Sequence, residues 1–379
     1  MDAQDEWVTK NHGRHLIMYQ HSVNQAALDF QERILTRVSR TFALTIPELP
    51  GDLRTIVGNA YLLCRIADTI EDDVALSPET KTRFHDDLNH VVTGQLDPIL
   101  FSDTLLPLLS AHTPDAEREL IANSHAVMTV TSVFSDETRS SISRCLTTMC
   151  HGMPIFQRNV SLAGLRDLDQ LNCYCYHVAG VVGEMLTALF CEHSESIAKR
   201  HASLMSLAAS FGQGLQMTNI LKDFWEDRNR GVCWLPRDIF LREHCDLSLL
   251  QAGHTDEAFS KGMQVLIGVA QGHLRNAFKY ALLIPRDEPG IRNFCLWAIG
   301  FAVLSLRKLH RNPSFKSGVE VKITRPTVRR VTRMLRWSVR HDSLLNLMFR
   351  ASIRGMPKAQ PFMIELAGGN QKLPLSEAD

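Results

Sequence analysis

Apolar residues recur at three- and four-residue spacing along most of this 379-residue chain, and this periodicity constrains the fold more than any other feature. The spacing matches one face of an α-helix, and few prolines interrupt it. The pattern is clearest over residues 56–71, 142–153, 171–190, 202–225 and 259–283. The sequence has no series of alternating β-branched residues and no strand–helix repeat. We therefore predict an all-α fold.

The breaks between these helical segments are short. They fall around residues 47–51, 77–78, 113–114, 230–236, 285–290 and 312–318. None is long enough or polar enough to separate two domains, and a hydrophobic content of 45% is ample for one large core. We predict a single domain over residues 31–356, after an N-terminal extension (1–30) and before a flexible C-terminal tail (357–379).

Charge and cysteine usage exclude several classes of protein. Lysine plus arginine equals aspartate plus glutamate at 41 each, so the chain lacks a basic excess and we predict no nucleic-acid partner. The first residues include Asp2, Asp5 and Glu6 and lack the apolar core of a secretory signal. The nine cysteines form no C-x-x-C pair, which favours the reducing cytoplasm. No uncharged apolar run of about 18 residues occurs, so no transmembrane helix is expected.

Two acidic clusters share the spacing Asp-x-x-Glu-Asp. Their members are Asp68, Glu71 and Asp72 in the first cluster, and Asp223, Glu226 and Asp227 in the second. Positions i, i+3 and i+4 share a helix face, where like charges destabilise the helix by about 0.2–0.5 kcal/mol per pair. Either cluster alone is explained by a solvated helix end. Two clusters with the same spacing, each beside an apolar turn, favour a functional site.

Carboxylates in this arrangement suit magnesium. Mg²⁺ takes oxygen ligands and commonly bridges carboxylates to the phosphates of a substrate. Two patches that face each other could hold Mg²⁺ over a diphosphate and stabilise the negative charge that it gains on leaving. The chain has neither G-x-x-x-x-G-K-[ST] nor G-x-G-x-x-G, which disfavours ATP chemistry. The sequence therefore predicts that the six carboxylates bind Mg²⁺ for another kind of diphosphate.

Four ordered motifs resemble those of the squalene/phytoene synthase family, most closely its squalene synthases. They lie at residues 39–42, 61–73, 174–183 and 216–227, followed by Arg230-Gly231 and Leu235-Pro236. The resemblance covers roughly residues 35–325. It implies an isoprenoid-synthase helical fold with a central active-site cavity. It also implies a prenyl transferase that joins two prenyl diphosphates head to head through a cyclopropylcarbinyl diphosphate.

The resemblance implies a role for each matching residue. The six carboxylates correspond to the family's two metal-binding motifs. Residues that match positions for substrate binding are Arg40, Tyr61, Arg65, Gln216, Asn219 and Lys222, of which the first three are also expected to be catalytic. Tyr174 matches the tyrosine near the proton loss that closes the cyclopropane. Because a phenol has a pKa of about 10, we expect Tyr174 to orient or relay the proton, which the departing diphosphate accepts. Gly180 and Gly183 are expected to allow close packing or to leave space for a long chain beside the helix.

The product depends on a reduction step. Squalene formation from farnesyl diphosphate, through presqualene diphosphate, needs a hydride from NADPH, whereas dehydrosqualene and phytoene synthesis ends by proton loss. Residues 318–325 resemble the stretch near the reductant site of squalene synthases, where Lys322 and Arg325 could meet a cofactor phosphate. An ordinary basic connection between helices explains this segment equally well. We predict squalene, with Mg²⁺ and NADPH as cofactors.

Two departures from the family's pattern keep other functions open. Lys222 stands where the family usually has arginine, which keeps the charge and loses the bidentate fork. Val232 replaces an arginine that serves diphosphate binding, for which Arg228 or Arg230 could substitute. The alternatives are dehydrosqualene or phytoene synthesis without reduction, prenyl transfer to an aromatic acceptor, and a catalytically silent prenyl-diphosphate-binding protein.

Residues 327–356 carry seven arginines and a single acid, Asp342, interleaved with apolar side chains. Such a stretch could lie as a basic amphipathic helix on an anionic membrane. It could equally pack on the domain with a solvated basic face. We predict a cytoplasmic enzyme, either soluble or in peripheral contact with the inner face of a membrane through this stretch. The sequence does not predict the oligomeric state.

Overall fold

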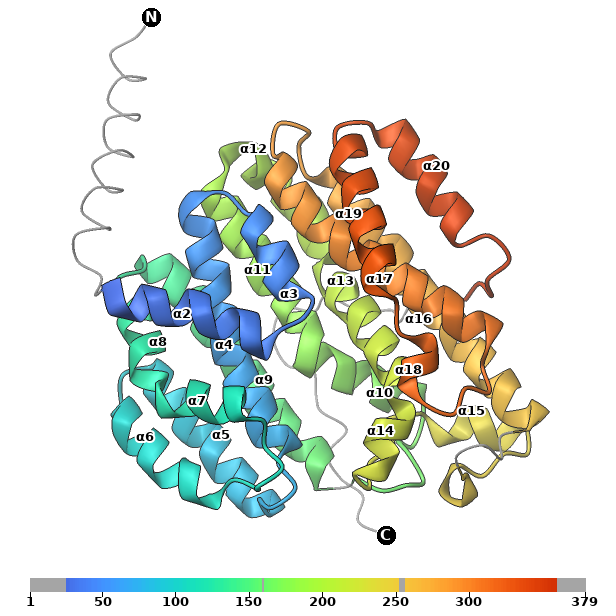
Figure 1. The fold of residues 1–379 in the computed structure, drawn as a ribbon, viewed down its shortest axis with the longest axis horizontal. Helices are drawn as coiled ribbons and strands as arrows, with labels where there is room; N and C mark the ends of the chain where they lie inside the picture. Colours follow the sequence, from blue (N-terminus) through green and yellow to red (C-terminus); the bar gives the residue numbers. More distant parts are fainter. Residues whose placement is uncertain (1–24, 159, 252–255, 360–379) are drawn as a thin grey trace, which may run out of the picture. The chain divides into compact units, whose positions relative to one another are not determined.

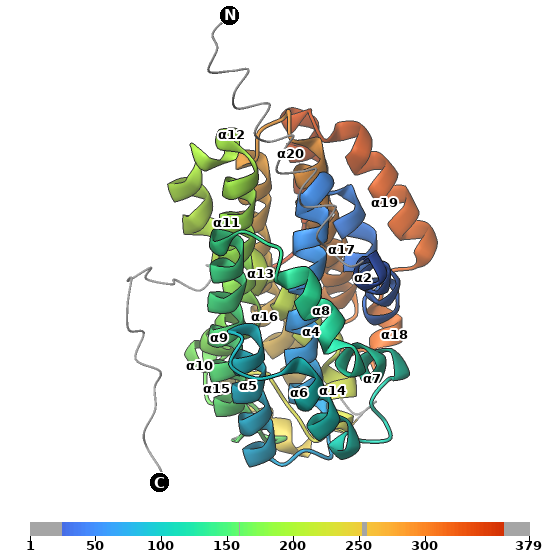
Figure 2. The same ribbon diagram turned by 90° about the vertical axis from the view of Figure 1, so that its left-hand side faces the viewer.

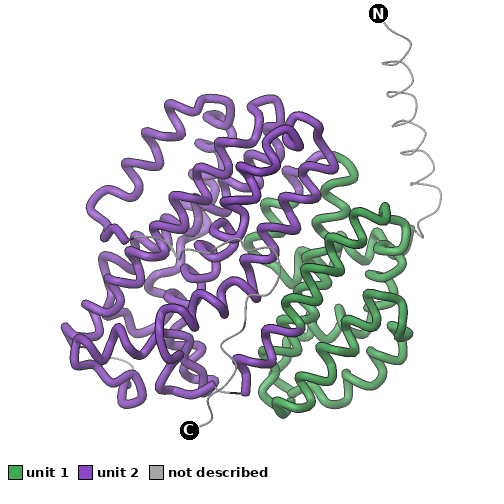
Figure 3. Tube along the Cα trace, turned by 180° about the vertical axis from the view of Figure 1, so that it is seen from behind, with its two compact units in different colours: residues 1–46, 51–150 green, residues 47–50, 151–379 purple. Residues whose placement is uncertain are grey.

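The computed structural model describes residues 25–158, 160–251 and 256–359 (Figure 1). These residues form helices, and their only β pairing is an isolated bridge between Leu165 and Pro236. The predicted all-α fold is confirmed. The described residues fall into two compact units (Figure 3). Unit 1 comprises the chain up to Ile46 and residues 51–150, and unit 2 comprises residues 47–50 and the chain from His151 onward.

The domain boundaries drawn from the sequence stay predictions. Helix α2 (Gln25–Val38) begins inside the stretch 1–30 that we expect to be an extension. Residues 1–24 and residues 360–379 of the expected tail lie outside the described residues.

Helix α4 (Gly51–Asp72) is the central element of unit 1. The helices that pack on it are α2, α5 (Pro78–Val92), α7 (Asp115–Ala122) and α8 (Ser124–Thr131). The unit also contains α3 (Phe42–Thr45), α6 (Pro98–Leu105) and the start of α9 (Asp136–Gln157). On α4 the side chains of Leu62, Ile66 and Ile70 are fully buried. Burying each stabilises the fold by roughly 1.5–3 kcal/mol, so the apolar periodicity decides which face of α4 points inward.

A buried amide links three of these helices. Asn59 on α4 donates to Gln31 Oε1 on α2 at 3.0 Å and to the Val127 carbonyl oxygen on α8 at 2.9 Å. Its Oδ1 accepts a hydrogen bond from Thr131 Oγ1 at 2.8 Å. Because both polar atoms of the Asn59 side chain have partners, the network sets the register of α4 against α2 and α8 without an unsatisfied group.

Unit 2 is built on three long helices that lie side by side in two perpendicular views (Figure 1 and Figure 2). They are α13 (His201–Lys222), α16 (Glu257–Leu283) and α17 (Pro289–Arg311). The shorter helices before α15 are α10 (Leu168–Cys175), a π-helical turn (Tyr176–Gly180), α11 (Val181–His193), α12 (Glu195–Ala198) and α14 (Phe224–Asn229). The others are α15 (Arg237–Arg242), α18 (Gly318–Val321), α19 (Arg325–Ser338) and α20 (Asp342–Ser352).

Glycines let α13 approach the neighbouring chain closely. A Cβ on Gly183 would lie 1.9 Å from the Ala208 carbonyl oxygen, and a Cβ on Gly212 would lie 1.9 Å from the Ala179 carbonyl oxygen. A side chain at either position would push the backbones apart. The close packing predicted at Gly183 is confirmed, and it fixes the direction of α13, whose last residues lead into the second acidic cluster.

Candidate functional site

The first acidic cluster occupies the last turn of α4. The Asp68 side chain is 35% exposed and Asp72 is exposed, whereas Glu71 is only 7% exposed. Lys81 on α5 donates its ammonium group to the Glu71 carbonyl oxygen at 2.5 Å, which satisfies part of the helix end. Acidic side chains at a helix C-terminus oppose the helix dipole, so this placement costs stability. The solvent-facing pair is Asp68 and Asp72, one turn apart.

Arg65 lies on α4 three residues before Asp68 and therefore beside this cluster. Its guanidinium forms an ion pair with Glu117 on α7, and its second terminal nitrogen is 3.7 Å from Asp68 Oδ2. Thr69 Oγ1 donates to the other Glu117 oxygen at 3.2 Å. Burial raises the pKa of Asp68 to about 7; the carboxylates of Asp72 and Glu117 act in the same direction, and Arg65 opposes them. The surroundings of the first cluster therefore disfavour the charged form of Asp68.

Tyr61 and Arg40 are linked through the segment between α2 and α3. The Tyr61 hydroxyl donates to the Val38 carbonyl oxygen at 3.1 Å, and its ring lies 5.2 Å from the ring of Phe42. Burial raises the pKa of Tyr61, which keeps the phenol neutral and able to donate. Arg40 lies between these two contacts and is exposed. Tyr61 thus positions the backbone that carries Arg40.

The second acidic cluster straddles a helix junction. Asp223 follows the last residue of α13, while Glu226 and Asp227 lie in the first turn of α14. Lys222 Nζ is 3.1 Å from Asp223 Oδ2 and donates to Asn219 Oδ1 at 2.9 Å. The structure therefore brings together the predicted residues from Asn219 to Asp227 at the junction of α13 and α14.

A residue far along the sequence completes this cluster. Lys322 Nζ donates to Glu226 Oε1 at 3.2 Å and is 3.6 Å from Asp223 Oδ1. Arg230 pairs with Asp227 Oδ1 at 2.6 Å. All three carboxylates of the second cluster thus contact cations of the chain itself. Glu226 Oε2 is buried, and it has no hydrogen-bond partner among the described residues.

Tyr174 is enclosed by aromatic side chains of unit 2. It is 4% exposed, and its ring stacks on Trp234 with 4.0 Å between centroids and 9° between planes. The Phe156 ring packs against the Tyr174 ring in an edge-type arrangement, with 5.3 Å between centroids and 68° between planes. Gln216, on α13, is half-buried. The contacts with Phe156 and Trp234 hold the Tyr174 ring in place.

Comparison with known proteins places the chain in a family. A family model described as squalene/phytoene synthase matches residues 35–332. This chain belongs to the squalene/phytoene synthase family. Squalene synthase ERG9 of Gibberella zeae is 29% identical over 305 residues, which cover 77% of this chain and 61% of that protein. Squalene synthase ERG9 of Candida albicans is 28% identical over 315 residues, which cover 82% of this chain and 67% of that protein. The chain thus spans less than two thirds of the Gibberella zeae protein.

Solved structures of similar proteins share the fold. The complex of TcSQS with the ligand E5700 has a TM-score of 0.68 at 24% identity, covering 88% of this chain and 93% of that chain. A dehydrosqualene synthase in complex with a ligand has a TM-score of 0.61 at 19% identity, covering 85% and 98%. These similarities confirm the isoprenoid-synthase fold. The central cavity stays a prediction.

Within the squalene/phytoene synthase pattern, the structure distinguishes the two candidates that could replace the arginine missing at Val232. Arg228 donates to the carbonyl oxygens of Leu162, Ser248 and Leu250, at 3.2, 3.0 and 2.8 Å. Its guanidinium is therefore used to tie two loops to α14. Arg230 instead pairs with Asp227, so of the two it is the one that contacts the second acidic cluster.

The donor atoms of both clusters fit Mg²⁺. They are carboxylate oxygens, which this hard ion prefers, and Glu226 Oε2 is a buried acceptor that no described donor satisfies. In the described part of the chain, no three His, Cys, Asp or Glu side chains are already grouped to hold a metal ion. Binding would therefore require the clusters to rearrange, and in the second cluster it would require the cations to move.

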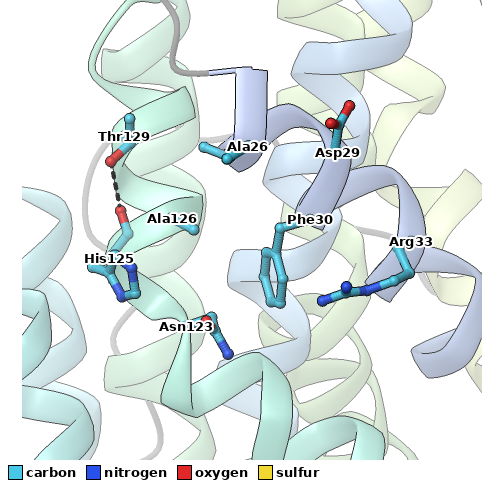
Figure 4. Close-up of a pocket in the computed structure, with 9 residues that line it drawn as sticks. Ala26, Asp29, Phe30, Arg33, Asn123, His125, Ala126 and Thr129 are labelled. Atoms are coloured by element: carbon cyan, nitrogen blue, oxygen red, sulfur yellow. Dashed lines mark hydrogen bonds between the residues drawn. The ribbon is translucent and has the colours of Figure 1, made fainter.

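Unit 1 also contains a pocket. It measures about 410 Å³ and opens between α2 and α8 (Figure 4). Its lining includes Phe30, Arg33, Asn123, His125 and Thr129. None of the residues predicted for catalysis or metal binding lines it.

Sequence reasoning missed the contacts that tie the second cluster to residues 312–322. The resemblance singled out Lys322 for a cofactor phosphate, but it gave no sign that Lys322 meets Glu226, which is 96 positions away. Trp225 Nε1 also donates to the Phe315 carbonyl oxygen at 2.6 Å. No local spacing encodes such contacts. Arg325, the other predicted cofactor residue, is exposed at the start of α19.

Proposed function

We propose that this chain is a prenyl transferase that condenses two farnesyl diphosphates head to head, through presqualene diphosphate, to squalene. The observation that carries the proposal is the second acidic cluster, where three carboxylates lie within 3.6 Å of three lysine or arginine side chains. The carboxylates of such a site can exchange these cations for Mg²⁺, which would in turn bind a diphosphate. The relatives named squalene synthase support the choice of substrate and product.

Each group has a separate task in this proposal. Asp68 and Asp72 in unit 1, and the three carboxylates of the second cluster in unit 2, would hold Mg²⁺, which neutralises the charge of a departing diphosphate. Arg65 and Lys222 stay near these carboxylates and limit their mutual repulsion. Tyr174 is held by Trp234 so that its hydroxyl orients the proton lost when the cyclopropane closes. NADPH would supply the hydride of the last step.

The test is product analysis with the full chain. Purified protein is incubated with farnesyl diphosphate and Mg²⁺, with and without NADPH, and lipid extracts are analysed by mass spectrometry. Squalene that forms only with both Mg²⁺ and NADPH is the expected result. A chelator should stop consumption of the substrate. Absence of consumption with either farnesyl or geranylgeranyl diphosphate, in the presence and absence of an aromatic acceptor, would leave the silent binder.

Dehydrosqualene or phytoene synthesis is the second candidate, and one contact favours it. Lys322, which we expect at the reductant site, is engaged by Asp223 and Glu226, so a cofactor phosphate would have to compete with two carboxylates. Product that forms equally with and without NADPH would establish this candidate. Dehydrosqualene would then indicate farnesyl diphosphate as substrate, and phytoene would indicate geranylgeranyl diphosphate.

We also propose that α19 and α20 contact an anionic membrane. Residues 325–341 include six arginines and no acid, and Arg329, Arg330, Arg333 and Arg340 are exposed. Trp337 is 84% exposed among them, and Leu347 on α20 is 65% exposed. Exposed tryptophan and leucine beside arginine suit the boundary between lipid headgroups and acyl chains. Arg336 is used differently, since it pairs with Glu48 and lies over the Trp297 ring.

Two other helical stretches, Leu168–His193 and Pro289–Arg311, are long and apolar enough to cross a membrane. Because 61% and 78% of their apolar windows are buried in the protein, they read as core helices. The surface on α19 and α20 is tested by flotation with phosphatidylserine-containing and with neutral vesicles. Trp337→Ser should lower binding to the anionic vesicles. Leu249→Ser, at a position 76% exposed outside these helices, is the matched control and should change nothing.

A further inference from the structure

Residues 312–322 lie directly on the second acidic cluster. Gly318 approaches it so closely that a Cβ there would be 2.5 Å from Glu226 Oε1 and 2.9 Å from the Lys222 carbonyl oxygen. The Trp225 indole nitrogen holds the Phe315 carbonyl oxygen at 2.6 Å. The backbone of this segment therefore lies against the cluster, and a side chain at position 318 would require Glu226 and the backbone at Lys222 to shift.

The segment is also fixed from its other side. Lys308 on α17 donates to the Lys322 carbonyl oxygen at 2.6 Å. Within the segment, Glu320 accepts hydrogen bonds from Asn312 Nδ2 and from the Lys316 backbone N–H, each at 3.0 Å. These bonds anchor the backbone on both sides of α18. The Lys322 side chain can consequently change partners while its backbone stays in place.

The Lys322 ammonium group occupies oxygens that a metal ion would need. Nζ contacts Glu226 Oε1 at 3.2 Å and Asp223 Oδ1 at 3.6 Å, and the Lys322 side chain is 37% exposed. A carboxylate oxygen that binds Mg²⁺ directly at about 2.0–2.1 Å leaves no room for an ammonium group in the same position. An ion that binds Glu226 Oε1 or Asp223 Oδ1 must therefore compete with the lysine.

Lysine is suited to such an exchange. Its charge sits at the end of a flexible four-carbon stem, and partly exposed ion pairs of this kind are individually weak. The contacts are strong enough to neutralise an empty cluster and weak enough to be displaced. Lys222 binds the other oxygen of Asp223, so Asp223 keeps one cation when Lys322 leaves.

We propose that Lys322 is an internal counter-ion of the second acidic cluster, which Mg²⁺ displaces from Asp223 and Glu226 when it binds. The inference rests on the proposed function, because it takes the cluster to be a magnesium site. It assigns to Lys322 a role before any cofactor binds, distinct from contact with a cofactor phosphate.

The first test measures Mg²⁺ binding by calorimetry on the full chain without substrate. Lys322→Met removes the competing charge and should bind Mg²⁺ about fivefold more tightly than the unaltered protein. Lys322→Arg retains the charge and should bind like the unaltered protein. Lys316→Met, an exposed lysine of the same segment, should also leave the affinity unchanged. Equal or weaker binding by Lys322→Met would overturn the inference.

A second measurement uses the unaltered protein, so it does not depend on the folding of a variant. The reactivity of each lysine towards acetic anhydride is read by peptide mass spectrometry with and without Mg²⁺. Mg²⁺ should increase acetylation of Lys322 and leave Lys316 unchanged. Equal acetylation of Lys322 in both conditions, at a concentration where Mg²⁺ binds, would contradict displacement.

The two proposals fail in different ways. Mg²⁺ binding and squalene formation without any effect at Lys322 would remove the counter-ion role and leave the proposed function standing. Absence of Mg²⁺ binding in the unaltered protein and in every variant would overturn both. Binding that is detected only in Lys322→Met would support the counter-ion role directly.

Discussion

The two acidic clusters have the same spacing in the sequence and opposite electrostatic surroundings in the structure. The first lies at the C-terminal end of α4, against the negative end of the helix dipole; Arg65 beside Asp68 is shared with Glu117, and the Lys81 ammonium group is held by the Glu71 carbonyl oxygen. The second is divided between the end of α13 and the first turn of α14, and each carboxylate contacts a lysine or arginine. In the first cluster the surroundings disfavour the charge of Asp68, whereas in the second each carboxylate has a cation of the chain beside it.

This difference teaches that one motif can be prepared for a metal in two ways. In the first cluster the fold carries the cost of ionising Asp68, and a bound ion would relieve it. In the second cluster the chain supplies substitutes that a bound ion must replace. The first should therefore gain more stability from Mg²⁺ than the second.

Removing a carboxylate tests whether both clusters are needed, and it should have the largest effect. Asp72→Asn and Asp223→Asn should each lower kcat/KM by about 10²–10³-fold, because each takes charge away from the groups that would hold the metal. The comparison predicts a split in stability: Asp72→Asn should leave the melting temperature unchanged or raise it, and Asp223→Asn should lower it slightly. Kinetics with farnesyl diphosphate and thermal melts measure both. Asp103→Asn, an exposed acid on α6, is the control. Full activity in either cluster variant would refute the metal assignment.

Removing a cation should separate the clusters by stability. Arg65→Met leaves Glu117, whose side chain is 10% exposed, without its ion-pair partner and should lower the free energy of unfolding by about 2 kcal/mol. Lys222→Met should cost only about 0.5 kcal/mol, because Lys322 still contacts Asp223. Urea unfolding of the metal-free proteins gives both values. Equal losses would show that the surroundings of the two clusters do not differ as the contacts indicate.

The contrast between the clusters marks the limit of what the sequence predicts. Apolar periodicity predicted the helices, and spacing predicted which carboxylates lie near one another. It did not predict that Glu71 is buried. Residues advance by about 100° per position on a helix, so Glu71 and its neighbour Asp72 diverge by that angle although both flank Asp68. The tertiary packing of α4 then decides which of them reaches solvent.

Contacts between distant segments were equally beyond the sequence. Arg228 has the charge of a diphosphate ligand, yet three loop carbonyl oxygens use its guanidinium. Whether an arginine binds backbone carbonyl oxygens or a carboxylate depends on where the segments around residue 162 and at residues 248–250 run. No local sequence pattern predicts that path. The fold and the carboxylates were therefore predictable, and the cations that serve them were not.

The pH dependence of stability should distinguish the first cluster by a smaller effect. The pKa of Asp68 is raised to about 7 in the folded protein, while an unfolded aspartate has a pKa of about 3.9. Between these values the folded state binds more protons than the unfolded state, so the stability of the metal-free protein should fall as the pH rises from about 4 to about 7. Solvent reaches a third of the side chain, so the change should be modest. Asp68→Asn should remove this part of the pH dependence of the free energy of unfolding, which is measured by urea unfolding at a series of pH values. An unchanged pH dependence would show that the surroundings do not disfavour the charge of Asp68.

The smallest effect is expected where the second cluster departs from the family. Lys222→Arg restores the residue that is usual there and retains the positive charge beside Asp223 and Asn219. If charge balance is what Lys222 provides, kcat/KM should stay within about threefold, because the contact that the fork would strengthen is already shared with Lys322. Steady-state kinetics on Lys222→Arg and Lys222→Met separate charge from shape. A large gain in kcat/KM in Lys222→Arg alone would show that this cluster needs bidentate geometry. The two clusters would then differ in geometry as well as in charge.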